Sequence, residues 1–200
     1  MTYKLLLNGT VLSLFDYSGQ WSRPYRENGY HVIQIDLKLG TNVMDIDADW
    51  LTKHGPIDII LAAPPCTDFA VSGARWFKEK DADGRTVKSL ELISKILEIV
   101  RMASPRIWAL ENPVGRLPRL LPEIGKPWYW QPFWFGDPYT KKTGLWGKFS
   151  IPDITNVVDP IKVCKQGSWI QKLGGKSERT KELRSITPLG FAYAFYEVNK

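Results

Sequence analysis

A cysteine framed by two prolines and a glutamate that follows an apolar run are the residues best suited to covalent chemistry. Prolines fix the backbone torsion φ and lack an N–H donor, so Pro64-Pro65 forms a stiff segment that projects the side chain of Cys66 in a set direction. A thiolate so placed can act as a nucleophile. Glu111 emerges from the apolar residues 107–110 directly into Asn112-Pro113, where a desolvated carboxyl group could carry a proton at neutral pH. The structural alternatives are a small buried thiol and an ion-paired or helix-capping glutamate.

Two further positions could hold a nucleoside. Gly19 follows the apolar residues 11–15 and precedes a helix-like segment, 21–28, so its backbone could approach a ligand closely. Asp36 ends the next apolar run, and a carboxylate there can accept hydrogen bonds from ribose hydroxyls. Both features fit a nucleoside-bearing cofactor, and the structural alternative is a tight turn with a surface aspartate.

Basic residues interleaved with aromatic ones indicate an anionic partner. The chain carries 27 Lys and Arg against 21 Asp and Glu, a formal net charge of +6. Cations mixed with aromatic rings suit unstacked or single-stranded nucleic acid, although charge runs are also common on solvated faces. The basic residues are Lys141, Lys142 and the stretch 172–181, which includes Arg179 and Lys181; the aromatic residues are Trp134, Tyr139, Trp146 and Trp169.

Composition excludes several classes of protein. Hydrophobic residues make up 44% and charged residues 24% of the 200 residues, which excludes a disordered or fibrous chain. No apolar run approaches the roughly 18 residues of a membrane helix, and Met1 to Lys4 lead into few apolar residues, so we expect no signal peptide. Cys66 and Cys164 are the only cysteines, which favours a reduced, cytoplasmic setting without disulfides. His31 and His54 are isolated, and we expect no metal site.

The elements that must position these residues alternate between strands and helices. Residues 11–15, 32–35, 57–61 and 107–110 predict strands. A helix is predicted over 86–103, and another begins after Pro188. The apolar stripe of the first helix is Val87, Leu90, Ile93, Leu97 and Val100, and that of the second is Phe191, Phe195 and Val198. The pattern predicts an α/β, Rossmann-like fold with a mostly parallel sheet covered by helices on both faces, whose carboxyl strand ends bind the ligand.

No linker divides the chain, so we expect one catalytic domain over 1–200. Residues 112–176 are rich in Pro, Gly, Trp and Lys and show few periodic runs, apart from a possible strand at residues 144–146. They are interpreted as loops and edge strands on the same core.

The order of these segments resembles that of the DNA (cytosine-5) methyltransferase family. Pro64-Pro65-Cys66 resembles the family's Pro-Cys loop, and Glu111-Asn112-Pro113 resembles its Glu-Asn-Val segment. Residues 136–142 resemble its Gly-x-Pro-Gln-x-Arg-x-Arg segment, and residues 185–199 resemble its final helix. The short, tryptophan-rich chain is similar to phage or prophage members.

The resemblance implies transfer of a methyl group from S-adenosylmethionine to C5 of cytosine in DNA, through a covalent adduct with Cys66 and with Glu111 acting on N3 of the base. The base would be single-stranded or flipped out of a duplex. The basic runs described above predict that Lys141, Lys142, Arg179 and Lys181 bind the nucleic acid. The implied cofactor residues are Phe15, Asp16, Tyr17, Gly19, Asp36, Asp45, Ile46 and Pro64.

The sequence departs from the family pattern in three places. Tyr17 stands where the family has a glycine, and Tyr139, Lys141 and Thr143 stand in place of the polar Gln-x-Arg-x-Arg set. Lysines cannot copy the bidentate hydrogen bonds of arginines. The region between Lys141 and the tail is short, which implies a reduced target-recognition region.

Two other functions are compatible with the sequence. One is an amino-methyltransferase that acts on an exocyclic base nitrogen, although Cys66 occupies the place of the aromatic residue that such enzymes stack on the base. The other is a nucleic-acid-binding protein with a methyltransferase-like fold and no turnover, which Tyr17 and the short recognition region support. Measurement of donor binding separates this last function from catalysis.

Overall fold

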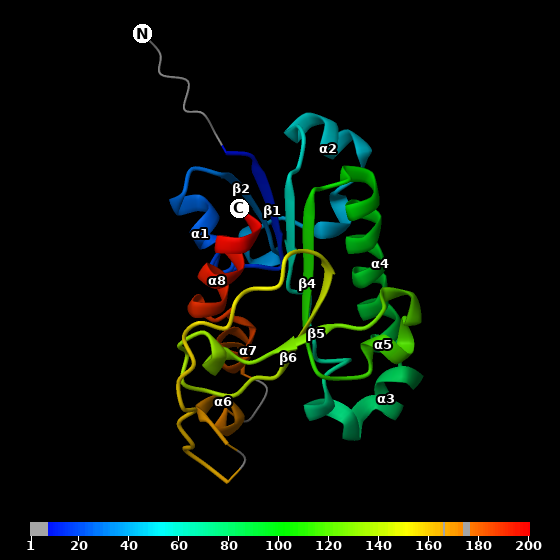
Figure 1. The fold of residues 1–200 in the computed structure, drawn as a ribbon. Helices are drawn as coiled ribbons and strands as arrows, with labels where there is room; N and C mark the ends of the chain where they lie inside the picture. The colour runs from blue at the N-terminus through cyan, green and yellow to red at the C-terminus, as the bar shows by residue number, and fades with distance from the viewer. Residues whose placement is uncertain (1–7, 166, 174–176) are drawn as a thin grey trace.

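The computed structural model describes residues 8–165, 167–173 and 177–200, which form a six-stranded sheet flanked by helices (Figure 1). The strands are β1 (Thr10–Leu14), β2 (His31–Ile35), β3 (Ile59–Ala62), β4 (Ile107–Pro113), β5 (Trp128–Trp130) and β6 (Thr143–Lys148). The helices are α1 (Arg23–Glu27), α2 (Ala48–His54), α3 (Phe77–Ala82), α4 (Arg85–Ala103), α5 (Leu117–Leu120), α6 (Trp169–Lys172), α7 (Glu178–Ser185) and α8 (Leu189–Asn199). The signal-peptide prediction at Met1 to Lys4, and Lys176 of the basic stretch, lie outside the described residues.

The sheet confirms the predicted α/β, mostly parallel architecture. Its strand order is β2-β1-β3-β4-β6-β5. The first four strands in this order are parallel to one another, and β6 runs antiparallel to both β4 and β5. Strands β1 and β3 are almost wholly buried, as expected for parallel strands covered on both faces. The predicted strand at residues 144–146 is the centre of β6.

Helices cover the two faces of the sheet with separate hydrophobic clusters (Figure 1). On one face, Leu12 and Leu14 of β1 pack in the same cluster as Ile93 of α4. On the other face, aromatic residues dominate, and the rings of Trp130 and Phe191 stack at 3.7 Å. The predicted apolar face of α8 is confirmed at Phe191 and Phe195, which are fully buried, whereas Val198 is partly exposed.

The end of α8 is fastened to the end of β6. The backbone N–H of Ser150 donates to Oδ1 of Asn199 at 2.8 Å, and Nδ2 of Asn199 donates to the Ser150 carbonyl at 2.9 Å. Asn199 is 1% exposed, so this clasp between Ser150 and Asn199 is shielded from water. It fixes the point at which the chain leaves the sheet for residues 151–186.

The predicted apolar stripe of α4 is wrong at its first turn. Val87 is 56% exposed, and the buried positions there are the polar residues Thr86 and Ser89. The physical reason is that this turn faces a buried cluster of charged groups, where hydroxyls find hydrogen-bond partners and a valine would not. Farther along, Ile93, Ile96 and Ile99 form the buried apolar face.

No helix in the described parts of the chain combines the length and apolar character that crossing a bilayer requires. The same residues hold no group of three or more His, Cys, Asp or Glu side chains that could bind a metal ion.

Candidate active site

The predicted site residues meet because the four parallel strands end at the same edge of the sheet. Leu14 of β1 pairs with Ile35 of β2 and with Ala62 of β3, which in turn pairs with Leu110 of β4. The segments that follow these residues therefore lie side by side. They begin with Phe15, Asp36, Ala63 and Glu111.

Cys66 lies on a tight turn that β4 holds in place. The carbonyl of Cys66 accepts hydrogen bonds from the backbone N–H groups of Phe69 and Ala70, at 3.0 and 2.9 Å. Nδ2 of the fully buried Asn112 donates to the carbonyl of Pro64 at 3.3 Å. The stiff double-proline segment predicted from the sequence is thus tied directly to the residue that follows Glu111.

Glu111 supplies a buried acceptor beside the thiol. The residue is 7% exposed, and its Oε1 makes no hydrogen bond within the described part of the chain. The ammonium group of Lys141 lies 3.8 Å from that oxygen, too far for a hydrogen bond. A buried polar atom without a partner is costly, so this geometry favours a ligand that brings a donor to Glu111.

The charges around Cys66 show how closely these groups are placed. Burial raises the pKa of the Cys66 thiol above its ordinary value, and the negative charge of Glu111 raises it further. The positive charges of Lys141 and Arg184 lower it. Cys66 is therefore held mainly as a neutral thiol, and a change in any of these three charges will alter its ionisation.

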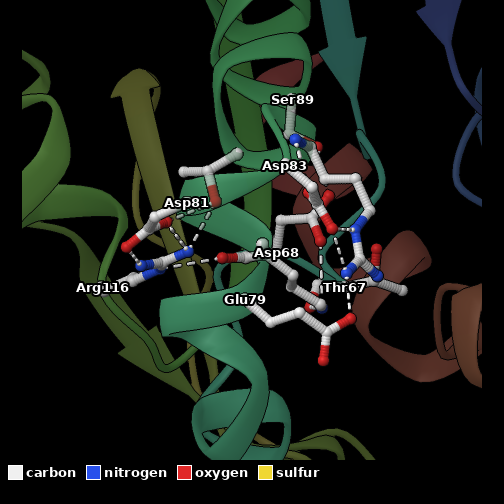
Figure 2. Close-up of polar contacts among 10 residues, drawn as sticks. Thr67, Asp68, Glu79, Asp81, Asp83, Ser89 and Arg116 are labelled. Atoms are coloured by element: carbon white, nitrogen blue, oxygen red, sulfur yellow. Dashed lines mark hydrogen bonds and ion pairs between the residues drawn. The ribbon is translucent and has the colours of Figure 1, made fainter.

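A buried polar cluster supports the turn, and Figure 2 shows the polar contacts among its residues. Asp68, two residues after Cys66, pairs with Nζ of Lys80 at 2.9 Å and accepts from the hydroxyl of Ser89 at 2.5 Å. Nε of Arg116 donates to the Asp68 carbonyl at 2.9 Å, and its other nitrogens donate to Asp81 and Thr86. Lys80 also donates to the carbonyl of Thr67. Elements α3 and α4 and the segment after β4 thereby fix the backbone on one side of Cys66.

The absence of a side chain at Gly115 lets two loops touch. A Cβ atom at this position would lie 1.9 Å from the carbonyl oxygen of Phe69, which is too close for atoms that are not bonded to each other. Ala70 and Gly115 form an isolated bridge, and the N–H of Arg116 donates to the Phe69 carbonyl at 2.9 Å. The Cys66 turn and the chain after β4 therefore form one unit.

The side chain of Asp16 holds the shape of the loop after β1 through hydrogen bonds within that loop. Its buried carboxylate accepts hydrogen bonds from the hydroxyls of Ser13, Ser18 and Ser22 and from the backbone N–H of Ser22. Gly19 has a φ of +66°, a conformation that favours glycine, and Phe15 has a φ of +60°, which strains a residue with a side chain. Asp16 thus contributes to this loop by holding its shape.

Tyr17 is 49% exposed. The ammonium group of Lys38 lies 5.3 Å from the centre of its ring. Tyr17 therefore covers the outer side of the loop.

The remaining cofactor candidates differ in accessibility. Asp36 uses Oδ1 to accept the N–H of Lys38 at 2.9 Å, and its other carboxylate oxygen makes no hydrogen bond within the described residues. Asp45 is exposed, but Ile46 is 1% exposed and packs in the hydrophobic core, so its side chain does not reach the surface. Pro64 is buried and contributes its carbonyl to the hydrogen bond from Asn112.

The structure does not unite the predicted nucleic-acid residues in one patch. Lys141 points to Glu111, whereas the neighbouring Lys142 is exposed, with its ammonium group 5.0 Å from the centre of the Tyr129 ring. Arg179 and Lys181 are exposed on α7, where Lys181 pairs with Glu178 at 2.5 Å. Trp146 is 3% exposed and donates to the Gly125 carbonyl, so it belongs to the core and cannot stack on a base from this position.

Helix α7 brings to the site a residue that sequence analysis missed. Arg184 donates to the hydroxyl of Ser72 at 3.5 Å, and its charge acts on Cys66. The helix is attached to the other side of the site by Lys38, which pairs with Glu182. The sequence signal for this helix is Ser177, whose hydroxyl accepts the N–H of Thr180 as an N-terminal cap.

Comparisons with known proteins identify the family to which this chain belongs. Residues 16–118, more than half of the chain, match the family described as C-5 cytosine-specific DNA methylase. A solved structure described as a DNA modification methyltransferase encoded within a prophage of E. coli is similar in fold, with a TM-score of 0.50 and 17% identity. That match covers 86% of this chain and 56% of the other, so this chain spans little more than half the length of that relative. No curated protein matches. The matched segment contains Cys66 and Glu111 and the residues that hold them, and the chain belongs to the C-5 cytosine-specific DNA methylase family.

Proposed function

We propose that this protein methylates C5 of cytosine in DNA through a covalent adduct with Cys66, using S-adenosylmethionine as the methyl donor. The observation that carries this proposal is the pairing of Cys66 with Glu111, whose buried Oε1 makes no hydrogen bond within the described chain. A cytosine whose N3 meets that oxygen would satisfy the buried acceptor when either group carries a proton. The family membership of the chain supports the same reaction.

The two residues divide the chemistry between them. C5 of cytosine is too weak a nucleophile to take a methyl group directly. The Cys66 thiolate adds its electron pair to C6, the C5–C6 double bond opens, and Glu111 protonates or hydrogen-bonds N3, which leaves an electron-rich C5. After methylation, the C5 proton goes to a base, the double bond reforms, and Cys66 leaves as the thiolate.

The positive charges near Cys66 assist the first step. Since Lys141 and Arg184 lower the pKa of the thiol, they favour the thiolate that attacks the base. The thiol is nonetheless mainly protonated before the substrate arrives, because burial and Glu111 act in the opposite direction. A proton transferred from Cys66 toward Glu111 would remove that opposition and leave Glu111 ready to donate to N3.

Residues at the ends of β1 and β2 fit the donor. Gly19 gives the loop its left-handed turn, with the side chain of Gln34 packed where a Cβ would point. The carboxylate oxygen of Asp36 that makes no hydrogen bond within the described residues can accept a ribose hydroxyl. When bound there, S-adenosylmethionine supplies an electrophilic methyl group. The substrate base must reach Cys66 unstacked, either from single-stranded DNA or after flipping from a duplex.

A covalent trap tests this proposal. DNA that contains 5-fluorocytosine should form a stable adduct with the wild-type protein and donor, because fluorine blocks the final elimination from C5. We expect Cys66→Ser to abolish both the adduct and turnover, since a serine hydroxyl is far less ionised than a thiol. Denaturing electrophoresis reports the adduct, and the matched control is Cys164→Ser, which changes the other cysteine and should leave the adduct intact.

Product identity separates this function from the alternatives. Nucleosides from treated DNA should contain 5-methylcytosine. N4-methylcytosine without an adduct would establish an amino-methyltransferase instead. DNA binding with neither an adduct nor a methylated product would establish a binding protein without turnover.

A further inference from the structure

A cavity of about 230 Å³ lies next to the loop after β1 and contains polar groups that the proposed reaction does not use. Gln20, the residue after Gly19, lines one side, and Leu183 of α7 and Leu189 of α8 line others. Asp137 and Tyr139, from the segment before β6, and Trp169 also line it, together with Ile186 and Pro188. The volume is below the roughly 300–1,000 Å³ of sites that enclose a whole drug-sized ligand, so it suits one end of a larger molecule.

Asp137 presents an unpaired negative charge to this cavity. Its Oδ2 accepts the backbone N–H of Gly190, near the start of α8, at 3.0 Å. Among the described residues no Lys, Arg or His forms an ion pair with it, and its other carboxylate oxygen has no hydrogen-bond donor. Burial raises the pKa of Asp137, which is the expected response of a desolvated carboxylate that lacks a counter-charge.

Tyr139 connects this carboxylate to the catalytic pair. It is 8% exposed, and its hydroxyl makes no hydrogen bond within the described residues. Burial raises the pKa of Tyr139, and the negative charges of Asp137 and Glu111 raise it further, so the hydroxyl is within electrostatic reach of both acids. The ring of Trp169 lies 5.2 Å from that of Tyr139 and extends the aromatic wall. A carboxylate beside aromatic rings is suited to binding an ammonium group.

The position of the cavity points to the source of that ammonium group. The following step rests on the proposed function. The sulfur of the donor carries the adenosyl group, the methyl group and an amino-acid chain. If the ribose is held by Asp36 and the methyl group is delivered beside Cys66, the third substituent must leave the sulfur in another direction. The cavity adjoins Gln20 of the donor loop and, through Tyr139, the catalytic Glu111.

We propose that Asp137 binds the α-ammonium group of the methyl donor, with Tyr139 and Trp169 as the walls of this subsite. Asp137 also caps α8 through Gly190. Donor binding would thereby place a positive charge next to a carboxylate that no cation among the described residues neutralises. The assignment makes Asp137 a specificity-determining residue for donors with a free amino group.

Isothermal titration calorimetry with two ligands tests this assignment. The probes are S-adenosylhomocysteine and its deamino analogue, 4-(adenosylthio)butanoate, which lacks only the amino group. The wild-type protein should bind the deamino analogue about ten- to a hundredfold more weakly, as expected for loss of a charged hydrogen bond. Asp137→Asn should bind S-adenosylhomocysteine more weakly than the wild-type protein does, by a similar factor. The variant should no longer discriminate between the two ligands.

The variants separate recognition from folding. An asparagine at residue 137 can still accept the N–H of Gly190 through its amide oxygen, so α8 stays capped, and a thermal melt checks this point. Asp36→Asn is the matched control and should weaken both ligands equally, because both carry the ribose. The wild-type comparison of the two ligands needs no variant and stands even if Asp137→Asn does not fold.

The outcomes of these titrations distinguish failure of the ammonium subsite from failure of the proposed function. Equal wild-type affinity for the two ligands would overturn the ammonium subsite and leave the proposed function intact. Equal weakening of both ligands by Asp137→Asn would also overturn it and would assign Asp137 to the packing of α8. If the wild-type protein binds neither ligand, both the donor and the subsite are wrong.

Discussion

At the scale of single residues, the site is governed by opposing charges on one thiol. Glu111 raises the pKa of Cys66, while Lys141 and Arg184 lower it. The sequence predicts Glu111 and Cys66 as site residues because each follows an apolar strand at the binding edge of the sheet. It does not predict that Lys141 turns inward while Lys142 faces water, because two adjacent lysines in an irregular segment carry no periodic signal.

This balance predicts the pH dependence of thiol alkylation. With its pKa raised, Cys66 is mostly protonated near neutral pH, so alkylation by iodoacetamide should accelerate as the pH rises toward that pKa. Glu111→Gln removes a negative charge and should move the profile to lower pH, whereas Lys141→Met should move it to higher pH. The measurement is the alkylation rate between roughly pH 6 and 10, a range around the ordinary pKa of a cysteine. All the proteins carry Cys164→Ser, so that Cys66 is the only cysteine that reacts. Coincident profiles for all three proteins would show that these charges do not act on the thiol.

At the scale of elements, the Cys66 turn is supported by side chains from helices on one face of the sheet. Asp68, Lys80 and Arg116 are each less than a tenth exposed and bond to one another's backbone or side chains. The helical period predicts α4 and its length, but not the direction of its first turn. There, Thr86 and Ser89 face inward because tertiary hydrogen bonds outweigh the apolar pattern on which the prediction depended.

Removal of one partner in this cluster should be costly. Lys80→Met leaves the buried Asp68 carboxylate without its cation, and we expect a loss of about 3–5 kcal/mol in the free energy of unfolding. The double change Lys80→Met with Asp68→Asn should recover part of the loss, since it also removes the uncompensated charge. Urea denaturation measures both effects.

An exposed ion pair on the neighbouring helices provides the control. Arg85 pairs with Glu79 and Asp83, and these side chains are about half exposed. Arg85→Ala should therefore cost less than about 1 kcal/mol. A loss for Lys80→Met as small as that for Arg85→Ala would mean that the buried pair does not support the Cys66 turn.

At the scale of the whole molecule, the chain carries a formal net charge of +6, and two of its exposed lysines flank opposite ends of β6. Lys142 is exposed and directly precedes β6. It lies near the carboxyl end of β4, since the next residue, Thr143, pairs with Pro113. Lys148 is exposed at the other end of the same strand, where it pairs with Trp108 at the beginning of β4. The two lysines are therefore both exposed and flank β6, one just before its first residue and one at its last, at opposite edges of the sheet.

This pair tests which edge would contact DNA in the proposed reaction. If Lys142 contacts one phosphate, Lys142→Ala should flatten the slope of log K against log salt by about 0.9 on duplex DNA and weaken binding similarly for all sequences. Lys148→Ala should leave the slope unchanged. Fluorescence anisotropy at several salt concentrations measures both, and equal slopes for the two variants would place the phosphate contacts elsewhere.

The overall architecture follows from the sequence where apolar runs are regular, and less so where they are not. Four apolar runs that end in polar or proline-rich segments predict the parallel strands and the edge at which they meet. The short strand β5 is rich in tryptophan and lies between loops with no alternation of apolar and polar residues. Its pairing with β6 therefore depends on contacts that the local sequence does not encode, such as the stacking of Trp130 on Phe191.

The clasp between Ser150 and Asn199 has a consequence for protein engineering. It anchors the exit from β6 independently of residues 151–186, and most side chains between residues 153 and 165 are exposed. Loop-closure entropy grows slowly, by about 0.6 kcal/mol for each doubling of length, so an insertion after Asp159 should be tolerated. The chain is thus a host scaffold into which a target-recognition module could be inserted, and such an insertion would direct the proposed methylation to a chosen DNA sequence.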